Sequence, residues 1–219
     1  MNVHRLARPI LRHFRKQRMQ RFVSRFCVNS TTKVLDLGGS ALVWEVAEVR
    51  PDLTILNLSQ NRFNGDWFKR VEGDACAAPF ADQSFDIVFS NSVVEHVGSW
   101  DRQQEFAAEC MRCGKSFFVQ TPNRWFPIDL HTLLPFVHWL PRLFTACVPW
   151  SPRVILARSG KEELNDLMGL QLLTKKQMEM LFPGAEIIEE KFCGFTKSLL
   201  ATSVKSRCRA EGRSATFKP

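Results

Sequence analysis

Short apolar segments that each stop at a small or polar residue recur between Val34 and His96, and they constrain the fold of this chain more than any other feature. Their ends are Asp36-Leu37-Gly38-Gly39, Asn57, Asp74 and Asn91. Apolar strands that alternate with helical segments build a largely parallel sheet. Such a sheet binds its ligand beyond the carboxyl ends of the strands, where the strand order reverses. The pattern therefore predicts a doubly wound α/β fold with a ligand site made from consecutive strand ends.

The expected order of elements follows from this pattern. We predict strands at 33–37, 53–58, 70–73, 85–89 and 116–120, then an antiparallel pair at 186–192 and 197–204 around Gly194. Helices are expected at 40–50, at 102–111 and from Thr174, as N-cap, to Phe182. The domain is predicted to span 31–205, with a basic flexible tail at 206–219.

An insertion rich in Trp, Phe and Pro is expected at 124–158, after the fifth strand. Its prolines divide it into pieces too short to cross a bilayer. We interpret it as a cover over the ligand edge of the sheet. Its aromatic residues suit the core of a cap, an apolar substrate pocket or a membrane-contacting surface, and the sequence leaves these three uses open.

The positive charge of the chain is concentrated at one end. The chain has 30 basic and 22 acidic residues, and residues 1–26 contain eight Lys or Arg and no Asp or Glu. We therefore predict a basic amphipathic helical arm at 1–30, with a break near 15–18 where the apolar stripe changes phase. Packing of its apolar face on the domain is the favoured interpretation. Contact with anionic lipid comes second, and a nucleic-acid arm comes third.

The cellular compartment is predicted from three sequence features: membrane-spanning segments, a secretory signal and the spacing of the cysteines. No run of 18 apolar residues and no secretory signal pattern is seen. The seven cysteines are an odd number without the spacing of a disulfide scaffold, which predicts reduced thiols and a cytoplasmic protein, with a membrane-peripheral position left open. Cys110-x-x-Cys113 is interpreted as the end of a helix, and no metal site is predicted.

The first strand end carries an acid before two glycines, Asp36-Leu37-Gly38-Gly39. Glycines between a strand and a helix allow a ligand to approach the backbone closely. The loop lacks the G-x-G-x-x-G spacing of a dinucleotide site. The acid suits a cationic amino-acid end of a ligand, because Asp36 can face an ammonium or sulfonium group while backbone N–H groups take the carboxylate.

The later strand ends supply the remaining contacts that a nucleoside needs. Asn57 is placed to contact ribose hydroxyls, and Asp74 can accept a hydrogen bond from an exocyclic amine while the Ala75 N–H donates to a ring nitrogen. Asn91 and Ser92 are expected beside the reacting end of the ligand.

In these residues the chain resembles the class I S-adenosylmethionine-dependent methyltransferases. The resemblance is to small-molecule enzymes of the type 11 group, which are related to ubiquinone-pathway methyltransferases. The resemblance rests on VLDLGGS, NLS, GDA, PFADQSFDIVFSNSVVEHV, FFVQTPN and LLTKKQMEMLFPGAEIIEE, and covers about Lys33–Lys205. It implies a seven-stranded sheet with an antiparallel last strand, S-adenosylmethionine as cofactor, and a cofactor contact at Leu58. The family usually has glycine at the position of Ser40 and an acid at that of Asn57.

The resemblance also implies in-line attack of an acceptor on the sulfonium methyl, so that the protein mainly aligns the two and excludes water. An oxygen or nitrogen acceptor can also require a base. The chain has no tyrosine, and His131, near Asp129, is the first candidate, with Glu95 and His96 next. Some relatives bind a divalent metal through a Glu-x-x-Glu-His pattern, but Ser92 replaces its first carboxylate, so no metal is expected.

Three functions are left open. The favoured one is methyl transfer to a small, apolar or lipid-linked acceptor, because the insertion is aromatic and the arm is amphipathic. An RNA methyltransferase is the second, although nucleic acid is not the expected partner because the body of the chain is neutral. A non-catalytic methyltransferase-fold protein that binds or assembles with a partner is the third. The sequence does not indicate an oligomeric state.

Overall fold

Seven of the described strands form one mixed sheet in the order β3-β2-β1-β4-β5-β9-β8. The structure is a computed structural model that describes residues 3–58, 67–129, 134–136, 139 and 170–203. The strands are β1 (Lys33–Leu37), β2 (Asp52–Asn57), β3 (Lys69–Glu72), β4 (Phe85–Asn91), β5 (Gly114–Pro122), β8 (Glu186–Phe192) and β9 (Phe195–Thr202). The first five are parallel, and β9 is antiparallel to both β5 and β8. The predicted doubly wound, seven-stranded methyltransferase-like sheet is confirmed.

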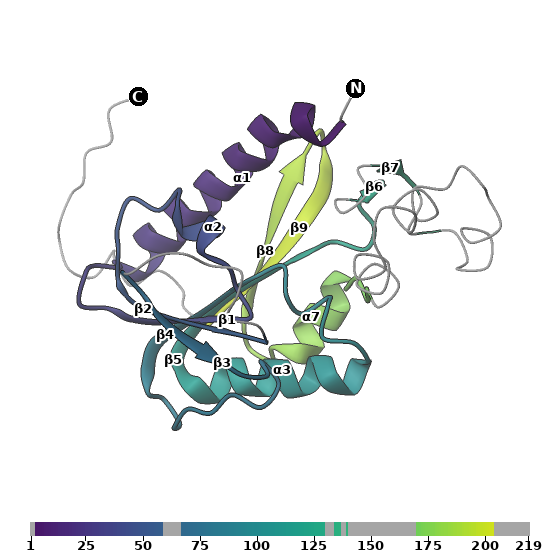
Figure 1. Ribbon diagram of the computed structural model, residues 1–219. Helices are drawn as coiled ribbons and strands as arrows, with labels where there is room; N and C mark the ends of the chain where they lie inside the picture. The colour runs from purple at the N-terminus through teal and green to yellow at the C-terminus, as the bar shows by residue number, and fades with distance from the viewer. Residues whose placement is uncertain (1–2, 59–66, 130–133, 137–138, 140–169, 204–219) are drawn as a thin grey trace.

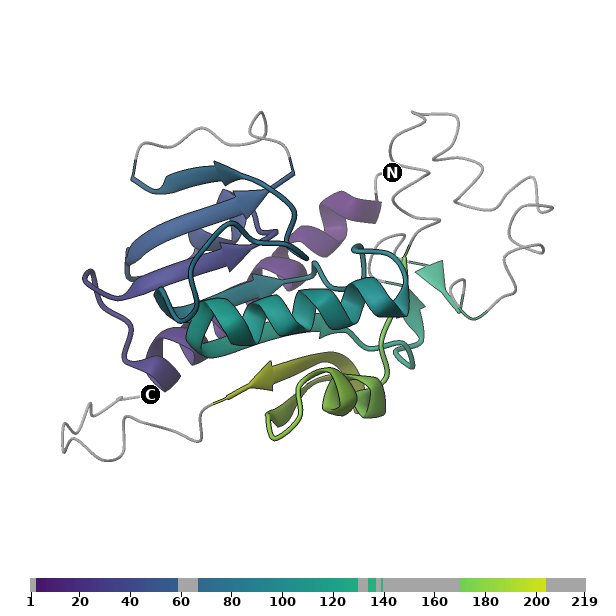
Figure 2. The same ribbon diagram turned by 90° about the horizontal axis from the view of Figure 1, so that it is seen from below.

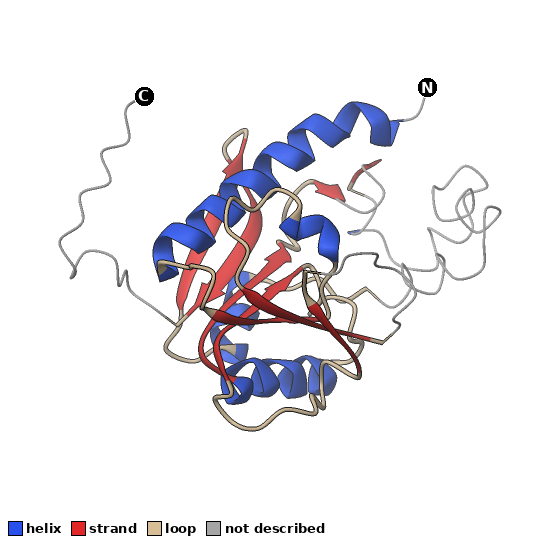
Figure 3. Cartoon of the chain, turned by 60° about the vertical axis from the view of Figure 1, so that its left-hand side comes forward, coloured by secondary structure: helices blue, strands red, loops and turns tan. Residues whose placement is uncertain are grey.

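Helices cover the sheet from both sides (Figure 1). One side carries α1 (Val3–Phe26) and the short α2 (Ala41–Trp44), and the other carries α3 (Trp100–Cys113) and α7 (Lys175–Leu181). Figure 2 shows α3 in front of the sheet with α1 behind it, and Figure 3 shows the strands between the two helical layers. A small pair, β6 (Ile128–Asp129) and β7 (Leu134–Pro135), lies outside the main sheet.

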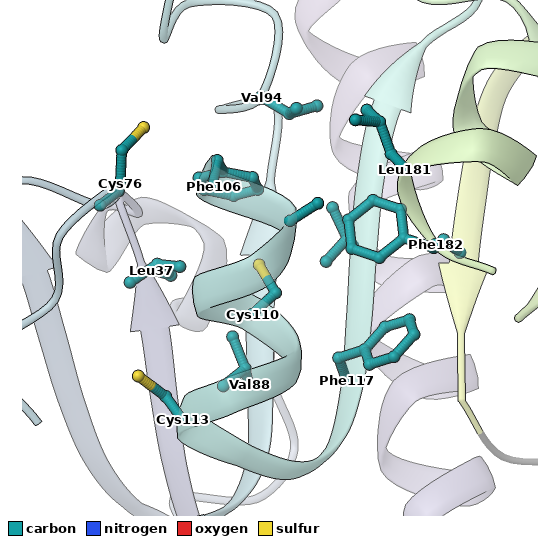
Figure 4. Close-up of a cluster of buried hydrophobic side chains, with 14 of the residues drawn as sticks. Leu37, Cys76, Val88, Val94, Phe106, Cys110, Cys113, Phe117, Leu181 and Phe182 are labelled. Atoms are coloured by element: carbon teal, nitrogen blue, oxygen red, sulfur yellow. The ribbon is translucent and has the colours of Figure 1, made fainter. Parts of the chain in front are cut away.

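Each face of the sheet has its own apolar core. Figure 4 shows the core on the α3 side, where Phe106 and Cys110 of α3 pack with Phe117 of β5 and with Phe182. The core on the other side is aromatic: Phe22 of α1 lies 4.9 Å from Phe89 and 5.5 Å from Phe118 between ring centroids. These contacts make the second half of α1 part of the domain core.

Two helix predictions are wrong. The predicted break near 15–18 does not occur, because α1 continues from Val3 to Phe26, with Pro9 inside it. Its apolar stripe changes phase because the second half packs on the sheet while the first half extends past the sheet edge (Figure 1). The predicted helix at 40–50 ends at Trp44, whose ring is buried in the aromatic core and fixes the chain there.

The predicted cap of α7 is confirmed in detail. Thr174 Oγ1 accepts from the Gln177 N–H at 3.3 Å, and Gln177 Oε1 accepts from the Thr174 N–H at 2.9 Å. This reciprocal pair satisfies two N–H groups that the helix itself leaves unbonded. It fixes where α7 begins, immediately after Leu173 bridges to Asn123 beyond β5.

Four cysteines are free thiols as expected: Cys76, Cys110, Cys113 and Cys193. Cys27 is disulfide-bonded, so the prediction of reduced thiols is wrong at this position, where the chain leaves α1 and the side chain is exposed. No helix within the described residues is both long and apolar enough to span a membrane.

Candidate cofactor site

A cavity of about 420 Å³ opens at the carboxyl ends of β1 to β4, where the strand order reverses between β1 and β4. This volume is in the range of small-molecule sites. The residues that line it come from the strand ends and the loops after them: Gly38, Asn57, Leu58, Gly73, Asp74, Ala75, Ser92, Val93, His96, Val97 and Arg102. Six of the nine predicted cofactor residues are among them.

The turn after β1 requires its two glycines. Gly38 has φ +77°, and a Cβ there would lie 2.4 Å from Val93 Cγ1. A Cβ on Gly39 would lie 2.0 Å from Asp36 Oδ1, so only glycine lets the chain fold over that carboxylate. Ser40 is extended at φ −135°, a conformation open to any residue. Serine at this position therefore adds no strain to the loop.

Asp36 lies beneath this turn and not on the cavity wall. Its side chain is fully buried, Oδ2 accepts from Trp44 Nε1 at 2.8 Å, and Oδ1 has no hydrogen-bond partner among the described residues. Burial raises the pKa of Asp36 to about 7, against the opposing effect of the Trp44 hydrogen bond. A buried oxygen without a partner next to a ligand cavity is a group that a cationic ligand can satisfy.

Asn57 has a second role that the sequence did not indicate. Its amide Nδ2 donates to the Gly39 carbonyl at 2.9 Å and to the Gly38 carbonyl at 3.3 Å. The amide is therefore committed to holding the glycine turn, and the side-chain oxygen is the atom left for a ribose hydroxyl. An acid at this position would face two carbonyl oxygens, so asparagine is matched to this loop.

Asp74 lies on the cavity wall beside Ala75 and is held from two directions. Its Oδ1 accepts from the Cys76 N–H at 2.9 Å, and its Oδ2 accepts from Arg102 Nη2. Partial burial alone would raise the pKa of Asp74, but the Cys76 N–H and the Arg102 guanidinium outweigh it and hold the pKa below its ordinary value. Asp74 is thus an ionised acceptor at the cavity wall.

Arg102 was missed by sequence reasoning. It lies in the first turn of α3, where Ser99 caps the helix by accepting from its N–H at 3.3 Å. Its guanidinium reaches back to Asp74, 28 residues earlier in the chain. A pairing between a helix and a distant strand end leaves no periodic signal in a sequence, and only the position of Arg102 near the start of a helix could have suggested it.

The predicted residues after β4 separate into two groups. Ser92, with φ +56°, and His96 line the cavity, and Ser92 Oγ donates to Gln120 Oε1 at 3.0 Å. Asn91 instead accepts from Arg18 Nη1 on the α1 side of the sheet. Glu95 is fully buried and accepts from Thr121 Oγ1 at 3.0 Å, so it faces the core and not the cavity. His131 lies outside the described residues.

The polar groups and the volume of the cavity fit S-adenosylmethionine. Asp74 and Asn57 offer acceptors to an amine and to hydroxyls, and the buried Asp36 oxygen suits a cationic amino-acid end. Among the described residues no group of three or more His, Cys, Asp or Glu side chains is arranged to hold a metal ion.

Comparison with known proteins agrees with this geometry. Residues 28–116 match the family described as a methyltransferase domain. No curated protein matches the chain significantly. A solved S-adenosylmethionine-dependent methyltransferase from Archaeoglobus fulgidus aligns with 92% of this chain and 100% of its own, at 14% identity and a TM-score of 0.57.

Two further solved structures share the fold. A chain of the complex between the Haloferax volcanii Trm112 methyltransferase activator and a methyltransferase covers 87% of this chain and 89% of its own, at 14% identity and a TM-score of 0.52. Haemonchus contortus phosphoethanolamine N-methyltransferase 2 covers 79% of this chain but only 38% of its own, at 16% identity and a TM-score of 0.53. Residues 28–116 thus match a methyltransferase domain, and the whole sheet has the fold of the class I S-adenosylmethionine-dependent methyltransferases. The cofactor of that class is S-adenosylmethionine.

Proposed function

We propose that this chain transfers a methyl group from S-adenosylmethionine to a small acceptor with an apolar or lipid-linked body. The observation that carries this proposal is the cavity at the carboxyl ends of β1 to β4, where Asn57, Asp74 and Ser92 converge from three strand ends. The bound cofactor supplies an activated methyl group, so the chemistry asked of the protein is alignment and exclusion of water.

Each side chain in the cavity then has a defined task. Asp74 accepts from the adenine amine, and Asn57 accepts from a ribose hydroxyl while its amide keeps the glycine turn in place. Asp36 balances the cationic amino-acid end from below the turn. His96, on the cavity wall, is the described candidate for accepting a proton from an oxygen or nitrogen acceptor. His131, outside the described residues, stays a proposal for that role, whereas the buried Glu95 faces the core and is not proposed again.

Peripheral contact with anionic lipid through residues 1–26 belongs to the same proposal. The apolar face of the second half of α1 is used in the domain core, which leaves its basic face outward: Arg12 and Lys16 are exposed. A basic surface of this kind attracts anionic membranes more than it buries into them. The proposed location is therefore cytoplasmic, at or near a membrane surface.

A second candidate is a methyltransferase-fold protein that binds a partner without turnover. It is favoured by one observation: Arg102 already pairs with Asp74, and the Gly39 turn already covers Asp36, so both acids are engaged without any ligand. Cofactor binding at Asp74 must therefore compete with the Arg102–Asp74 ion pair. An RNA acceptor is the third candidate, supported by the basic face of α1 alone.

Calorimetric titration with S-adenosylmethionine and S-adenosylhomocysteine tests the proposal. We expect micromolar binding that is lost in Asp74→Ala. Asp82→Ala is the matched control, because Asp82 pairs with Arg112 at 2.8 Å away from the cavity. Binding followed by methylation of a quinone, lipid or sugar acceptor supports the enzyme, whereas binding without turnover on any of these supports the second candidate. No binding of either ligand contradicts both.

A further inference from the structure

The loop after β4 forms one wall of the cofactor cavity, and it begins at a residue in an unusual backbone conformation. Four residues of this loop line the cavity: Ser92, Val93, His96 and Val97. Ser92 has φ +56°, in the left-handed region that residues other than glycine adopt rarely and at a cost in energy. Such a conformation persists only where the surrounding structure holds it. The contacts that hold Ser92 therefore set the course of this wall.

Gln120 of β5 holds Ser92 through both its backbone and its side chain. The Ser92 N–H donates to the Gln120 carbonyl at 2.9 Å, and Ser92 Oγ donates to Gln120 Oε1 at 3.0 Å. Gln120 itself is only 1% exposed and is not among the described residues that line the cavity. Its influence on a bound ligand therefore passes through Ser92.

Arg18 of α1 fixes the orientation of the Gln120 amide group. Its Nη1 donates to Gln120 Oε1 at 2.8 Å, while its Nε and Nη2 donate to Glu190 at 3.1 Å and 2.5 Å. Both neighbours of Oε1 are thus donors, and they use the two lone pairs of that oxygen. Turning the amide over would place its NH₂ group against two donors and would break both hydrogen bonds. The buried guanidinium therefore keeps Gln120 in the one orientation that accepts from Ser92.

The residues after Ser92 depend on this arrangement. Val93 lies against the glycine turn, because a Cβ on Gly38 would come within 2.4 Å of Val93 Cγ1. The His96 N–H donates to the Val93 carbonyl at 2.8 Å, so the position of His96 follows from that of Val93. A change of φ at Ser92 would displace both residues from the cavity wall.

We propose that Gln120 is a positioning residue for the cofactor site, which holds Ser92 in its left-handed conformation and is itself supported by Arg18. This inference rests on the proposed function and adds to it a residue that touches neither the cofactor nor the acceptor. It also makes cofactor affinity depend on the docking of α1, because one guanidinium contacts Gln120 of β5 and Glu190 of β8.

Calorimetric titration of the full chain with S-adenosylhomocysteine tests the role of Gln120. Methionine has a similar length but accepts no strong hydrogen bond, so Gln120→Met should weaken binding by about five- to tenfold. Gln120→Glu keeps an acceptor for both donors and should bind within about threefold of the parent. Gln177→Met is the matched control, because Gln177 Oε1 also accepts an N–H at 2.9 Å but caps α7 outside the cavity.

Three results of this titration would overturn the proposal: unchanged affinity in Gln120→Met, an equal loss in Gln177→Met, or a loss in Gln120→Glu as large as in Gln120→Met. The methionine comparison also distinguishes positioning from a general loss of stability, because the control removes an acceptor of the same kind elsewhere in the domain.

Two variants of Ser92 separate its conformation from a direct contact of its hydroxyl with the ligand. Glycine adopts positive φ without strain, whereas alanine does not. Ser92→Ala should therefore weaken S-adenosylhomocysteine binding more than Ser92→Gly, although both variants lose Oγ. Equal losses would mean that the hydroxyl contacts the ligand directly, and would contradict a role that acts through the backbone.

Amide hydrogen exchange of the ligand-free chain makes the test independent of the proposed function. Gln120→Met should speed exchange at the Ser92 and His96 N–H groups more than in β1. An equal or larger change in β1 would show a general loss of stability and would overturn the proposal, as would unchanged exchange at Ser92 and His96. If the parent binds no S-adenosylhomocysteine, the proposed function fails, and exchange still decides whether Gln120 holds the loop.

Discussion

Asp36 is the residue whose protonation links the cofactor to pH. Burial raises the pKa of this carboxyl to about 7, so in the free protein it is mostly protonated at pH 6 and mostly ionised at pH 8. A ligand with an ammonium or sulfonium group favours the ionised form. We predict that affinity for S-adenosylmethionine rises by up to about tenfold from pH 6 to pH 8, and that affinity for the uncharged 5′-methylthioadenosine does not.

Asp36→Asn provides the control, because asparagine keeps an acceptor for Trp44 Nε1. The variant should bind S-adenosylmethionine weakly at both pH values, with the pH dependence gone. The free energy of unfolding of the parent should fall, and not rise, between pH 6 and pH 8. The native pKa is raised, so the native state holds a proton that the unfolded state has lost, and stability of the parent falls as pH rises from about 4 through 7. Chemical denaturation at pH 5 and pH 8 measures this, and a parent that is equally stable at both would contradict the assignment.

The glycine turn and the end of β2 act together as one element. Asn57 donates to the Gly39 carbonyl at 2.9 Å and to the Gly38 carbonyl at 3.3 Å. The acid that the resembled family usually has at this position could not donate these hydrogen bonds. We predict that Asn57→Asp, although it restores the usual residue, destabilises the protein by about 1–3 kcal/mol, since a carboxylate would face two carbonyl oxygens. Thermal unfolding and titration with S-adenosylhomocysteine measure the effect.

Asn57→Ala separates loss of the hydrogen bonds from repulsion. It should fall between the parent and Asn57→Asp in stability. Tighter cofactor binding by Asn57→Asp would show that the turn rearranges readily and that its observed conformation is not required.

Helix α1 is attached to the sheet through a buried ion pair. Arg18 is 6% exposed and Glu190 is 7% exposed, and the pair also engages Asn91 and Gln120. Removing one member of such a pair leaves the other charge buried, so we predict that Arg18→Met costs about 3–5 kcal/mol. The double variant Arg18→Met/Glu190→Leu should recover part of this loss. Urea denaturation measures both, and a loss below 1 kcal/mol in the single variant would mean that α1 does not depend on the pair.

These elements show which features a sequence can predict. The sequence placed Asp74 and Ser92 at the same edge of the sheet, and both line the cavity. This was possible because the carboxyl ends of parallel strands meet at one edge, so a polar residue at the end of each strand can be located from the local sequence alone. Arg18 was placed only at the predicted break near 15–18 and among the basic residues of the arm, because nothing local distinguishes it from its exposed neighbours. Its partner Glu190 lies 172 residues away. Arg102 was missed for the same reason, because its pairing with Asp74 is a contact that only the folded chain creates.

The basic residues of the first 26 positions occupy different environments in the folded molecule. The basic excess in residues 1–26 predicted an arm, but α1 uses its residues differently along its length. Arg18 is part of the interior, Arg15 is partly buried, and Arg12 is exposed. A single segment therefore contributes both to the core and to the surface. The predicted domain boundary at residue 30 stays a prediction. The helix before it packs into the core of the sheet and is not a separate folding unit.

The domain should therefore unfold as one unit that includes α1. The two apolar cores share the central strands, and Phe22 of α1 contacts Phe89 and Phe118 within the second core. We predict that Phe22→Ala costs about 3–5 kcal/mol, whereas Phe195→Ala, at a side chain that is 57% exposed, changes stability by less than about 0.5 kcal/mol. Tryptophan fluorescence, to which the buried Trp44 contributes, and far-UV circular dichroism should report one coincident transition in urea. Loss of helical signal at lower urea than the fluorescence change would show instead that α1 separates first, and would make it an appended arm after all.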